Sequence, residues 1–297
     1  MDVLFDSFSS WQKYCTEKNE PLYHPVISYE IRQKAGSEKL IWEGMQNALQ
    51  VMKEAVHAGL NDEMKSFSGM INDGAKKVYN YPVAVLSREF QDLISRALAA
   101  KEVNSCMGRV VAAPTAGASG IMPGVLVTLQ EIHNLDDRKI MEGMLIGAGV
   151  ALIMQKRASI AGAVGGCQAE TGTAAAMAAA AIVHCLGGNH NQVMNAIAIT
   201  IQCMLGLVCD PVAGLVEIPC VVRNASAAAI ANSSAQIALS DVDAVIPVDE
   251  CVDAMGEIGQ SMDERYKETA QGGLAMTKTG QAISKRVLIQ DIDMIDE

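Results

Sequence analysis

A long segment with almost no charge is the feature of this sequence that most restricts its fold. Only seven of the 96 residues from 141 to 236 are charged, whereas charged residues make up 19% of the whole chain. A helix that faces water needs a polar face, so helices in this segment must be surrounded by protein on most sides. Most of the charge lies in residues 1–105 and 240–297, which we expect to form an outer layer.

Apolar residues recur at helical spacing along most of the chain, and the alternation typical of strands is nearly absent. We expect helices over residues 25–59 (one or two), 87–104, 125–134, 137–157, 172–186, 190–205 and 224–238. Two short pieces, 110–113 and 244–248, have a composition that suits extended segments. The sequence therefore predicts an all-α fold, a multi-helix globular domain with buried apolar central helices and irregular loops between them.

Charge and hydropathy argue against nucleic-acid and membrane proteins. The net charge of −11 would repel nucleic acids and anionic membrane surfaces. A transmembrane helix needs about 20 apolar residues. The runs 143–154, 171–187 and 192–209 are too short, too weakly apolar or interrupted by polar residues. The N-terminus has no signal-peptide pattern, so we expect a cytoplasmic protein whose eight cysteines stay reduced.

Three stretches in or beside the charge-poor segment do not have helical character. They are residues 113–124, 162–170 and 206–224, which are rich in Gly and Pro. Irregular backbone inside an apolar region carries polar groups that need hydrogen-bond partners. A bound ligand or cofactor is one way to supply those partners, so these stretches are the first place to look for a site.

Three cysteines lie in these stretches, and each is next to Gly or Pro residues. They are Cys167, Cys209 and Cys220. Interrupted helical backbone leaves N–H groups free near the sulfurs, as thiolates that hold an iron–sulfur cluster require. Spacing alone leaves two interpretations open, a metal site and buried structural thiols, because no Cys-x-x-Cys run is present.

The remaining cysteines have poorer settings for metal. Cys185 and Cys203 lie inside apolar helical patterns, so we expect them in the core. A zinc site around His184, Cys185 and His190 is disfavoured, because the spacing matches no usual zinc motif.

The loop from Pro114 to Gly120 consists mainly of small residues that let backbone N–H groups close on an anion. Thr115 and Ser119 add hydroxyl groups, and Gly117 adds flexibility. No Lys follows as in a nucleotide P-loop, so a substrate carboxylate fits the loop as well as a phosphate does. A tight loop between helices, with no ligand, is the alternative.

Two charged residues stand out because the segment around them has so few. A buried Arg223 must hold an anion or pair with an internal carboxylate such as Glu217 or Asp210. Glu170 would orient a ligand, act as a base, or pair with Arg157. Ser68, in the stretch SFSGM, is a further candidate for ligand contact.

Five motifs of the chain resemble those of the iron–sulfur-dependent L-serine dehydratases, in particular the α subunit of the two-chain form. The motifs are KRASIAGAVGGCQAETG, GLVCDPVAGLVEIPCVVRNA, AAPTAGASGIMPGVL, SFSGM and KETAQGGLAMTKTG. The resemblance covers most of the chain and implies that Cys167, Cys209 and Cys220 hold a [4Fe-4S] cluster. It implies one helical catalytic domain over 1–297, with a peripheral segment 1–60, a cluster-binding core 61–270 and a C-terminal tail 271–297.

The resemblance also implies an activity, L-serine ammonia-lyase, which converts L-serine to pyruvate and ammonia in amino-acid degradation and gluconeogenesis. An iron without a protein ligand would act as a Lewis acid on the substrate hydroxyl. We expect no pyridoxal phosphate, because its Schiff base needs a Lys and the three stretches contain none. The candidate substrate contacts are Thr115, Gly117, Ser119, Ser68 and Arg223, and the catalytic candidate is Glu170.

The family's two-chain form implies a β subunit and therefore a hetero-oligomer, and the catalytic base of the family belongs to that other part. Some single-chain relatives end in a Cys that reaches the open iron, whereas the last Cys here is Cys251. Two alternatives stay open. One is a cluster-dependent L-cysteine desulfidase, in which iron takes the substrate thiolate. The other is a metal-free helical scaffold subunit with inert buried thiols.

Overall fold

The computed structural model describes residues 5–295, without the side chains of residues 34–35 and 290–295. The described part forms α1 (Phe8–Lys18), α2 (Tyr23–Glu30), α3 (Glu38–Asn61), α4 (Gly74–Tyr79), α5 (Arg88–Ser105), α6 (Ile121–His133), α7 (Asp137–Arg157), α8 (Gly162–Gly165), α9 (Thr173–Cys185), α10 (His190–Met204), α11 (Cys220–Leu239), α12 (Val248–Ser261) and α13 (Lys278–Ile295). Two π-helical turns, η2 (Ile31–Ala35) and η3 (Gln168–Gly172), and three 3₁₀ turns, η4 (Val212–Gly214), η5 (Glu264–Tyr266) and η6 (Gly273–Met276), join them.

The all-α prediction is confirmed, since the described residues contain no strand and only two isolated β-bridges. Each of the seven expected ranges contains a helix, and the first contains α2 and α3. The two segments expected to be extended, 110–113 and 244–248, form no strand; residues 110–113 and 244–247 lie outside the helices, and Val248 begins α12. Helix α11 begins at Cys220, four residues earlier than expected, because Pro219 stands at its N-terminal boundary and does not interrupt it.

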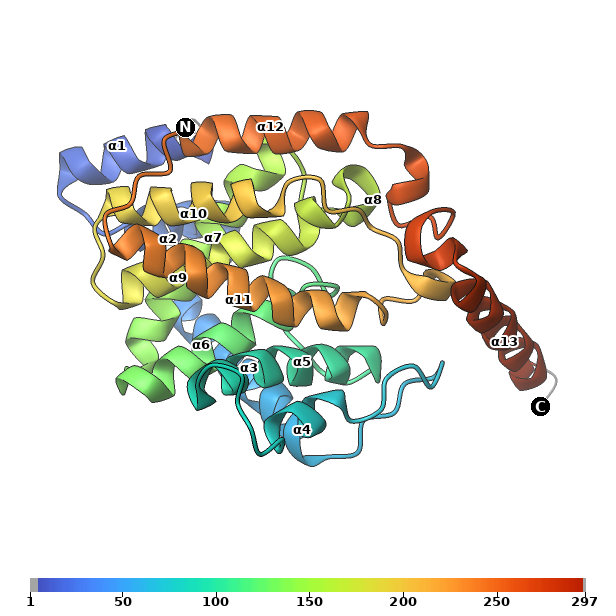
Figure 1. Cartoon of the computed structure of the whole chain (residues 1–297). Coiled ribbons are helices and arrows are strands. Elements are labelled where there is room, and N and C mark those ends of the chain that lie inside the picture. Colours follow the sequence, from blue (N-terminus) through green and yellow to red (C-terminus); the bar gives the residue numbers. More distant parts are fainter. Residues whose placement is uncertain (1–4, 296–297) are drawn as a thin grey trace.

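Helix α9 lies at the centre of the fold and explains the charge-poor segment. It packs against α6, α7, α10 and α11, and all its residues except His184 are buried. Eleven of its thirteen residues are apolar, as expected of a helix that is covered by protein on all sides. Figure 1 shows α10, α7 and α9 in the middle of the molecule, with α1 and α12 along one edge and α3, α4 and α5 along the other.

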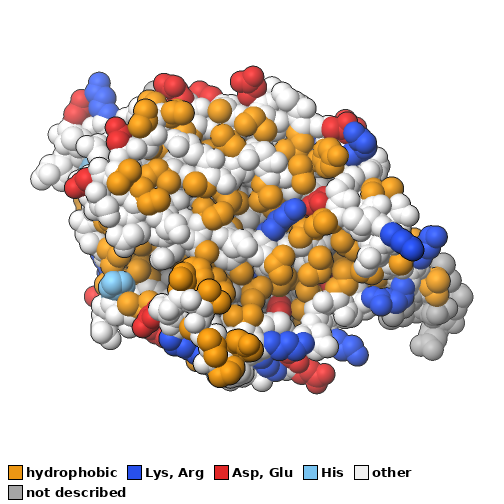
Figure 2. Space-filling view, viewed as in Figure 1, with side chains coloured by type: hydrophobic (Ala, Val, Ile, Leu, Met, Phe, Trp, Pro, Cys, Tyr) orange, Lys and Arg blue, Asp and Glu red, His pale blue; other side chains and the backbone are white. Residues whose placement is uncertain are grey.

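The face of the molecule drawn in Figure 2 carries few charged side chains in its middle. Hydrophobic side chains are spread over the middle of that face, and most Lys, Arg, Asp and Glu side chains lie toward its edge. Helix α13 projects from the body of the molecule (Figure 1). No helix in the described part of the chain has the length and apolar character needed to cross a bilayer.

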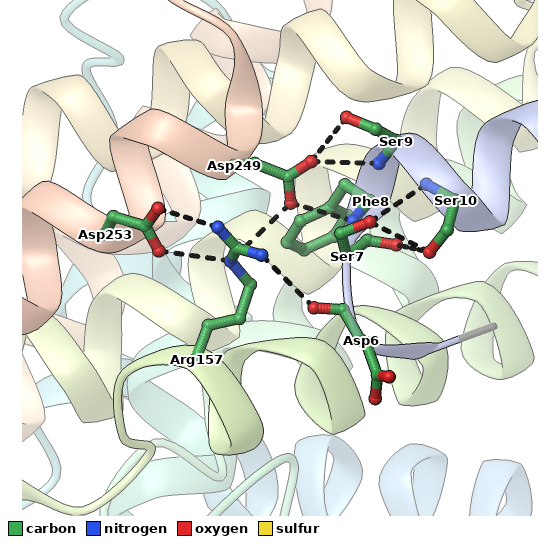
Figure 3. A network of polar contacts seen from close by, with 8 residues as sticks. All are labelled: Asp6, Ser7, Phe8, Ser9, Ser10, Arg157, Asp249 and Asp253. Carbon is green, nitrogen blue, oxygen red and sulfur yellow. Dashed lines mark hydrogen bonds and ion pairs between the residues drawn. The ribbon is translucent and has the colours of Figure 1, made fainter. Parts of the chain in front are cut away.

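A polar network fixes the N-terminal helix to the rest of the fold (Figure 3). The Asp249 carboxylate on α12 accepts a 2.9 Å hydrogen bond from the backbone N–H of Phe8, at the start of α1. Arg157, at the end of α7, forms an ion pair of 2.7 Å with Asp253 and donates to the backbone carbonyl of Asp6. The network therefore joins α1, α7 and α12, and it gives Arg157 partners other than Glu170.

Residues of the segment 1–60 share the main hydrophobic core. Trp11 is fully buried and donates from Nε1 to the Leu22 carbonyl at 3.0 Å. Leu49 and Met52 of α3 belong to the same buried cluster as α9. The division of the chain at residues 60 and 270 stays a prediction, and the packing shows that the N-terminal helices contribute to the core.

We predict that Gly59→Ala destabilises the fold by about 2 kcal/mol, because overpacking forces the backbone to shift. A Cβ on Gly59 would lie 2.3 Å from the backbone oxygen of Ala99, so α3 and α5 would have to separate. Gly44→Ala in the same helix is the matched control, since a Cβ there meets no atom within 4 Å. We expect the control to stabilise the fold by roughly 1 kcal/mol through helix propensity. Urea unfolding measures both, and equal midpoints would contradict the close approach.

Candidate functional site

The irregular segments meet at one end of the helical bundle. The segment between α7 and α9 bonds to the loop after α10, where the backbone N–H of Gln168 donates to Leu207 O at 2.9 Å. The side-chain oxygen of Gln168 accepts from the backbone N–H of Gly206 at 2.8 Å, and its amide nitrogen donates to Met255 O in α12 at 3.0 Å. Gln168 is fully buried. One buried amide thus joins three segments that are far apart in the sequence.

The three cysteines singled out by the sequence all lie buried at this end. Cys167 directly precedes the π-turn η3, Cys209 lies in the loop before α11, and Cys220 is the first residue of α11. Their exposed fractions are 2%, 3% and 7%. Cys209 is held by its backbone, because its N–H donates to Tyr266 O at 2.8 Å and its carbonyl accepts from the N–H of Glu268 at 2.9 Å.

The charges of the three thiols act on one another. Burial raises the pKa of Cys209, and the charges on Cys167, Glu268 and Cys220 raise it further. Burial raises the pKa of Cys220 to about 12, and the charge on Cys167 contributes to that shift. Three buried thiols within electrostatic reach are costly to ionise without a cation. A positively charged metal group would remove that cost.

Three thiols are the type of donor set that an iron–sulfur cluster takes. Within the described residues, no group of three or more His, Cys, Asp or Glu side chains is arranged to hold one metal ion. The ligands of a cluster bind different iron atoms, so they need not surround one point. The other thiols lie elsewhere, with Cys15, Cys185 and Cys251 buried and Cys106 half-buried. The expectation of a buried Cys203 is wrong, because its position on α10 faces outward and is exposed.

Two carboxylates and the Cys209 thiol approach one point next to Gly162, and the volume around that point is called the space beside Gly162. A Cβ on Gly162 would lie 3.3 Å from Cys209 Sγ, 3.3 Å from Glu268 Oε2 and 3.6 Å from Glu170 Oε2. Glu170 accepts a short hydrogen bond from the Thr115 hydroxyl. Burial raises the pKa of Glu170, and the Glu268 charge raises it further. The alternative that Glu170 pairs with Arg157 is therefore wrong.

The loop before α6 packs directly on Glu170. A Cβ on Gly117 would lie 2.4 Å from Glu170 Oε1, so only glycine fits there without displacing the carboxyl group. Asn224 of α11 clamps the loop, since its Nδ2 donates to Gly117 O and its Oδ1 accepts from Gly120 N–H, both at 2.9 Å. Ser119 is fully buried, and its hydroxyl has no hydrogen-bond partner within the described residues.

A lysine reaches the site from α5, which the sequence analysis did not anticipate. Lys101 is fully buried, and its Nζ donates to Val216 O at 3.0 Å. Burial lowers its pKa, whereas the negative charges on Cys220, Glu170 and Glu217 raise it. The three loops themselves contain no lysine, but Lys101 contacts one of them from outside through Val216. Lys101 occupies a buried position of the helix expected over 87–104, and a lysine at such a position is the sequence feature that could have identified it.

The other two substrate candidates have partners inside the chain. Arg223 forms an ion pair of 2.9 Å with Asp210 and donates to Val208 O at 2.8 Å. Of the two internal carboxylates that the sequence offered as partners, Asp210 is therefore the one that pairs with Arg223. Ser68 donates to Glu217 at 2.5 Å. Thr115 and Gly117 instead contact Glu170, and Ser119 has no partner in the described residues. The loop of residues 114–120 is thus the stronger candidate for substrate contact.

Comparisons with known proteins agree on one family. A family model described as "Serine dehydratase alpha chain" matches residues 17–275. The chain is 43% identical over 277 residues to "L-serine dehydratase, alpha chain" of Peptoniphilus asaccharolyticus, which covers 92% of this chain and 95% of that relative. It is 41% identical over 274 residues to "Probable L-serine dehydratase, alpha chain" of Bacillus subtilis (strain 168), with 91% of each covered. "L-serine dehydratase TdcG" of Escherichia coli (strain K12) is 37% identical, with 92% of this chain but 62% of that longer relative covered.

Proposed function

Since the chain belongs to the serine dehydratase alpha chain family, we propose that it converts L-serine to pyruvate and ammonia at a [4Fe-4S] cluster held by Cys167, Cys209 and Cys220. The observation that carries the proposal is the burial of these three thiols at one end of the bundle, where their charges act on one another. We place the enzyme in amino-acid degradation, in the cytoplasm, without pyridoxal phosphate.

The cluster would supply one iron without a protein ligand, a Lewis acid toward the serine hydroxyl. The chain's own residues then have to place the substrate against it. The loop of residues 114–120 offers the Thr115 and Ser119 hydroxyls and a backbone that Gly117 keeps close to Glu170. These groups bind the substrate carboxylate or amine in our proposal. Asn224 holds the loop in place from α11.

Proton transfer is the second task, because dehydration removes the α-proton of serine and the hydroxyl group as water. Glu170 is the candidate within this chain, since its Oε2 faces the same space as Cys209 Sγ. Burial raises the pKa of Glu170 toward neutral pH, and a group exchanges protons most effectively when its pKa is near the working pH. A base from a partner chain is the alternative. The enamine product becomes an imine and takes up water to give pyruvate and ammonia.

We propose a partner chain, the β subunit, and therefore a hetero-oligomer. The names of the first relatives contain "alpha chain", and the longer Escherichia coli relative extends well beyond the matched region. Exposed apolar side chains such as Val222, Ile237 and Val245 accord with a covered surface, as does the charge-poor middle of the face in Figure 2.

Substrate choice tests the proposed function. The chain is purified anaerobically with its partner chain, and pyruvate formation is followed with L-serine and with L-cysteine. We expect efficient turnover of L-serine and little of L-cysteine. Preference for L-cysteine with release of sulfide would favour the desulfidase. Absence of turnover from either substrate, in colourless protein, would favour the metal-free scaffold.

We predict that Gly117→Ala lowers kcat/KM for L-serine about 100-fold, because small displacements of catalytic groups have large effects. The added Cβ overlaps the Glu170 carboxyl group and pushes it away from Thr115. Ala112→Ser is the control, since residue 112 is exposed and lies just before the loop of residues 114–120. We expect near wild-type activity from the control and unchanged helical circular dichroism from both. A fully active Gly117→Ala enzyme would remove Glu170 and this loop from the site.

A further inference from the structure

Glu268 has a backbone conformation that glutamate rarely adopts. Its φ angle is 63°, in the left-handed region that favours glycine. Two backbone hydrogen bonds join this segment to Cys209. The Cys209 N–H donates to Tyr266 O at 2.8 Å, and the Glu268 N–H donates to Cys209 O at 2.9 Å. Strained residues of this kind persist where the surrounding structure enforces them, and they concentrate at functional sites. The chain therefore retains an unfavourable side chain at a position next to a proposed cluster ligand.

The side chain of Glu268 faces the proposed reaction space. Its Oε2 lies 3.3 Å from the point that a Cβ on Gly162 would occupy, as Cys209 Sγ does, and Glu170 Oε2 lies 3.6 Å from the same point. Residue 268 is exposed and residue 170 is half-buried, so Glu268 lies on the solvent side of the space. Within the described residues, no lysine, arginine or histidine forms an ion pair with Glu268.

Two carboxylates that face one small space repel each other unless a cation lies between them. Lys101, an internal cation whose charge acts on Glu170, is itself fully buried and donates to Val216 O. The substrate of the proposed reaction brings its own cation, since the α-ammonium group of L-serine is bonded to the carbon next to the one that carries the hydroxyl. A hydroxyl directed at the metal beside Cys209 would bring the ammonium group into the same small space.

We propose that Glu268 binds the α-ammonium group of L-serine and thereby selects for amino acids over other 3-hydroxy acids. The inference rests on the proposed function and adds a substrate-binding residue to it. Glu268 and Glu170 both contact the ammonium group in this proposal, since their Oε2 atoms lie 3.3 Å and 3.6 Å from the same point beside Gly162. The loop of residues 114–120 is left to receive the carboxylate.

The first test is Glu268→Gln in the anaerobic holoenzyme with its partner chain. We expect KM for L-serine to rise about tenfold or more, the size typical of a lost hydrogen bond to a charged group. The inhibition constant of 3-hydroxypropionate, which lacks the ammonium group, should stay within about twofold of wild type on the same reasoning. Glu264→Gln, an exposed neighbour in the same segment, is the control and should change neither value.

A second variant, Glu268→Gly, separates binding from backbone structure. Glycine tolerates a φ of 63°, so we expect a melting temperature equal to or above that of wild type. KM for L-serine should rise as in Glu268→Gln. Wild-type KM in either variant, or equal weakening of L-serine and 3-hydroxypropionate, would overturn the inference. Wild-type enzyme that makes no pyruvate from L-serine would instead overturn the proposed function, and unchanged binding of L-serine to Glu268→Gln in calorimetry would still decide against Glu268.

Discussion

Iron content is expected to fall to background in Cys167→Ala, Cys209→Ala and Cys220→Ala when each variant is purified anaerobically. Each thiol is buried at the same end of the bundle, and loss of one leaves two ligands for a group that needs three. Activity with L-serine should be lost in all three. Helical circular dichroism should be unchanged, because the core formed around α9 does not include these side chains.

Two other cysteines provide controls for the iron measurement. Cys185 is buried in the main core and contacts the Lys139 carbonyl, whereas Cys203 is exposed on α10. We expect Cys185→Ala and Cys203→Ala to keep full iron. Full iron in a variant of Cys167, Cys209 or Cys220 would remove that residue from the ligand set. Loss of iron in Cys203→Ala would contradict the assignment of the ligands to Cys167, Cys209 and Cys220.

Activity is expected to disappear in air while the fold remains. An iron without a protein ligand is accessible to any small molecule that enters the space beside Gly162, and dioxygen oxidises such a site. The helices hold their packing through apolar side chains, which do not depend on the metal. Iron(II) with a thiol reductant should restore activity. The measurement follows pyruvate formation and helical circular dichroism together during exposure to air.

Stable activity over many hours in air would contradict the open iron. It would mean that a fourth ligand protects the site. Cys106 and Cys251 are candidates for such a ligand, but the structure gives both thiols other surroundings. Cys251 contacts the Ile246 carbonyl and Gln202, and the pKa of Cys106 is raised by burial and by the charge on Glu102. Loss of helical circular dichroism together with activity would contradict the prediction that the fold does not depend on the metal.

The fold was largely accessible from the sequence because helix formation depends on local spacing. Apolar residues at helical intervals predicted the positions of α5, α7, α9 and α10 closely, whereas the single range 25–59 covered both α2 and α3. The lack of charge in residues 141–236 predicted the burial of α9 for a physical reason, since an exposed helix needs polar groups. Cys203 was misjudged because an apolar neighbourhood in the sequence does not show which face of α10 is covered.

The site was only partly accessible, because its members come together over long distances in the chain. The loops were recognisable by Gly and Pro, and Asn224 ends the stretch 206–224, but Lys101 reaches the site from α5. Glu268 follows Cys209 by 59 residues in the sequence, and backbone hydrogen bonds bring the two segments together. No spacing rule links these residues, so the structure was needed to bring them together.

The central claim is that three thiols of this chain hold a [4Fe-4S] cluster, and metal analysis of the wild-type protein tests it most directly. The protein is purified anaerobically with its partner chain, and iron, zinc and acid-labile sulfide are measured per chain. The account predicts about four iron and four sulfide per chain, with brown absorbance and no zinc. Colourless protein without iron and sulfide, or protein that contains zinc alone, would contradict it.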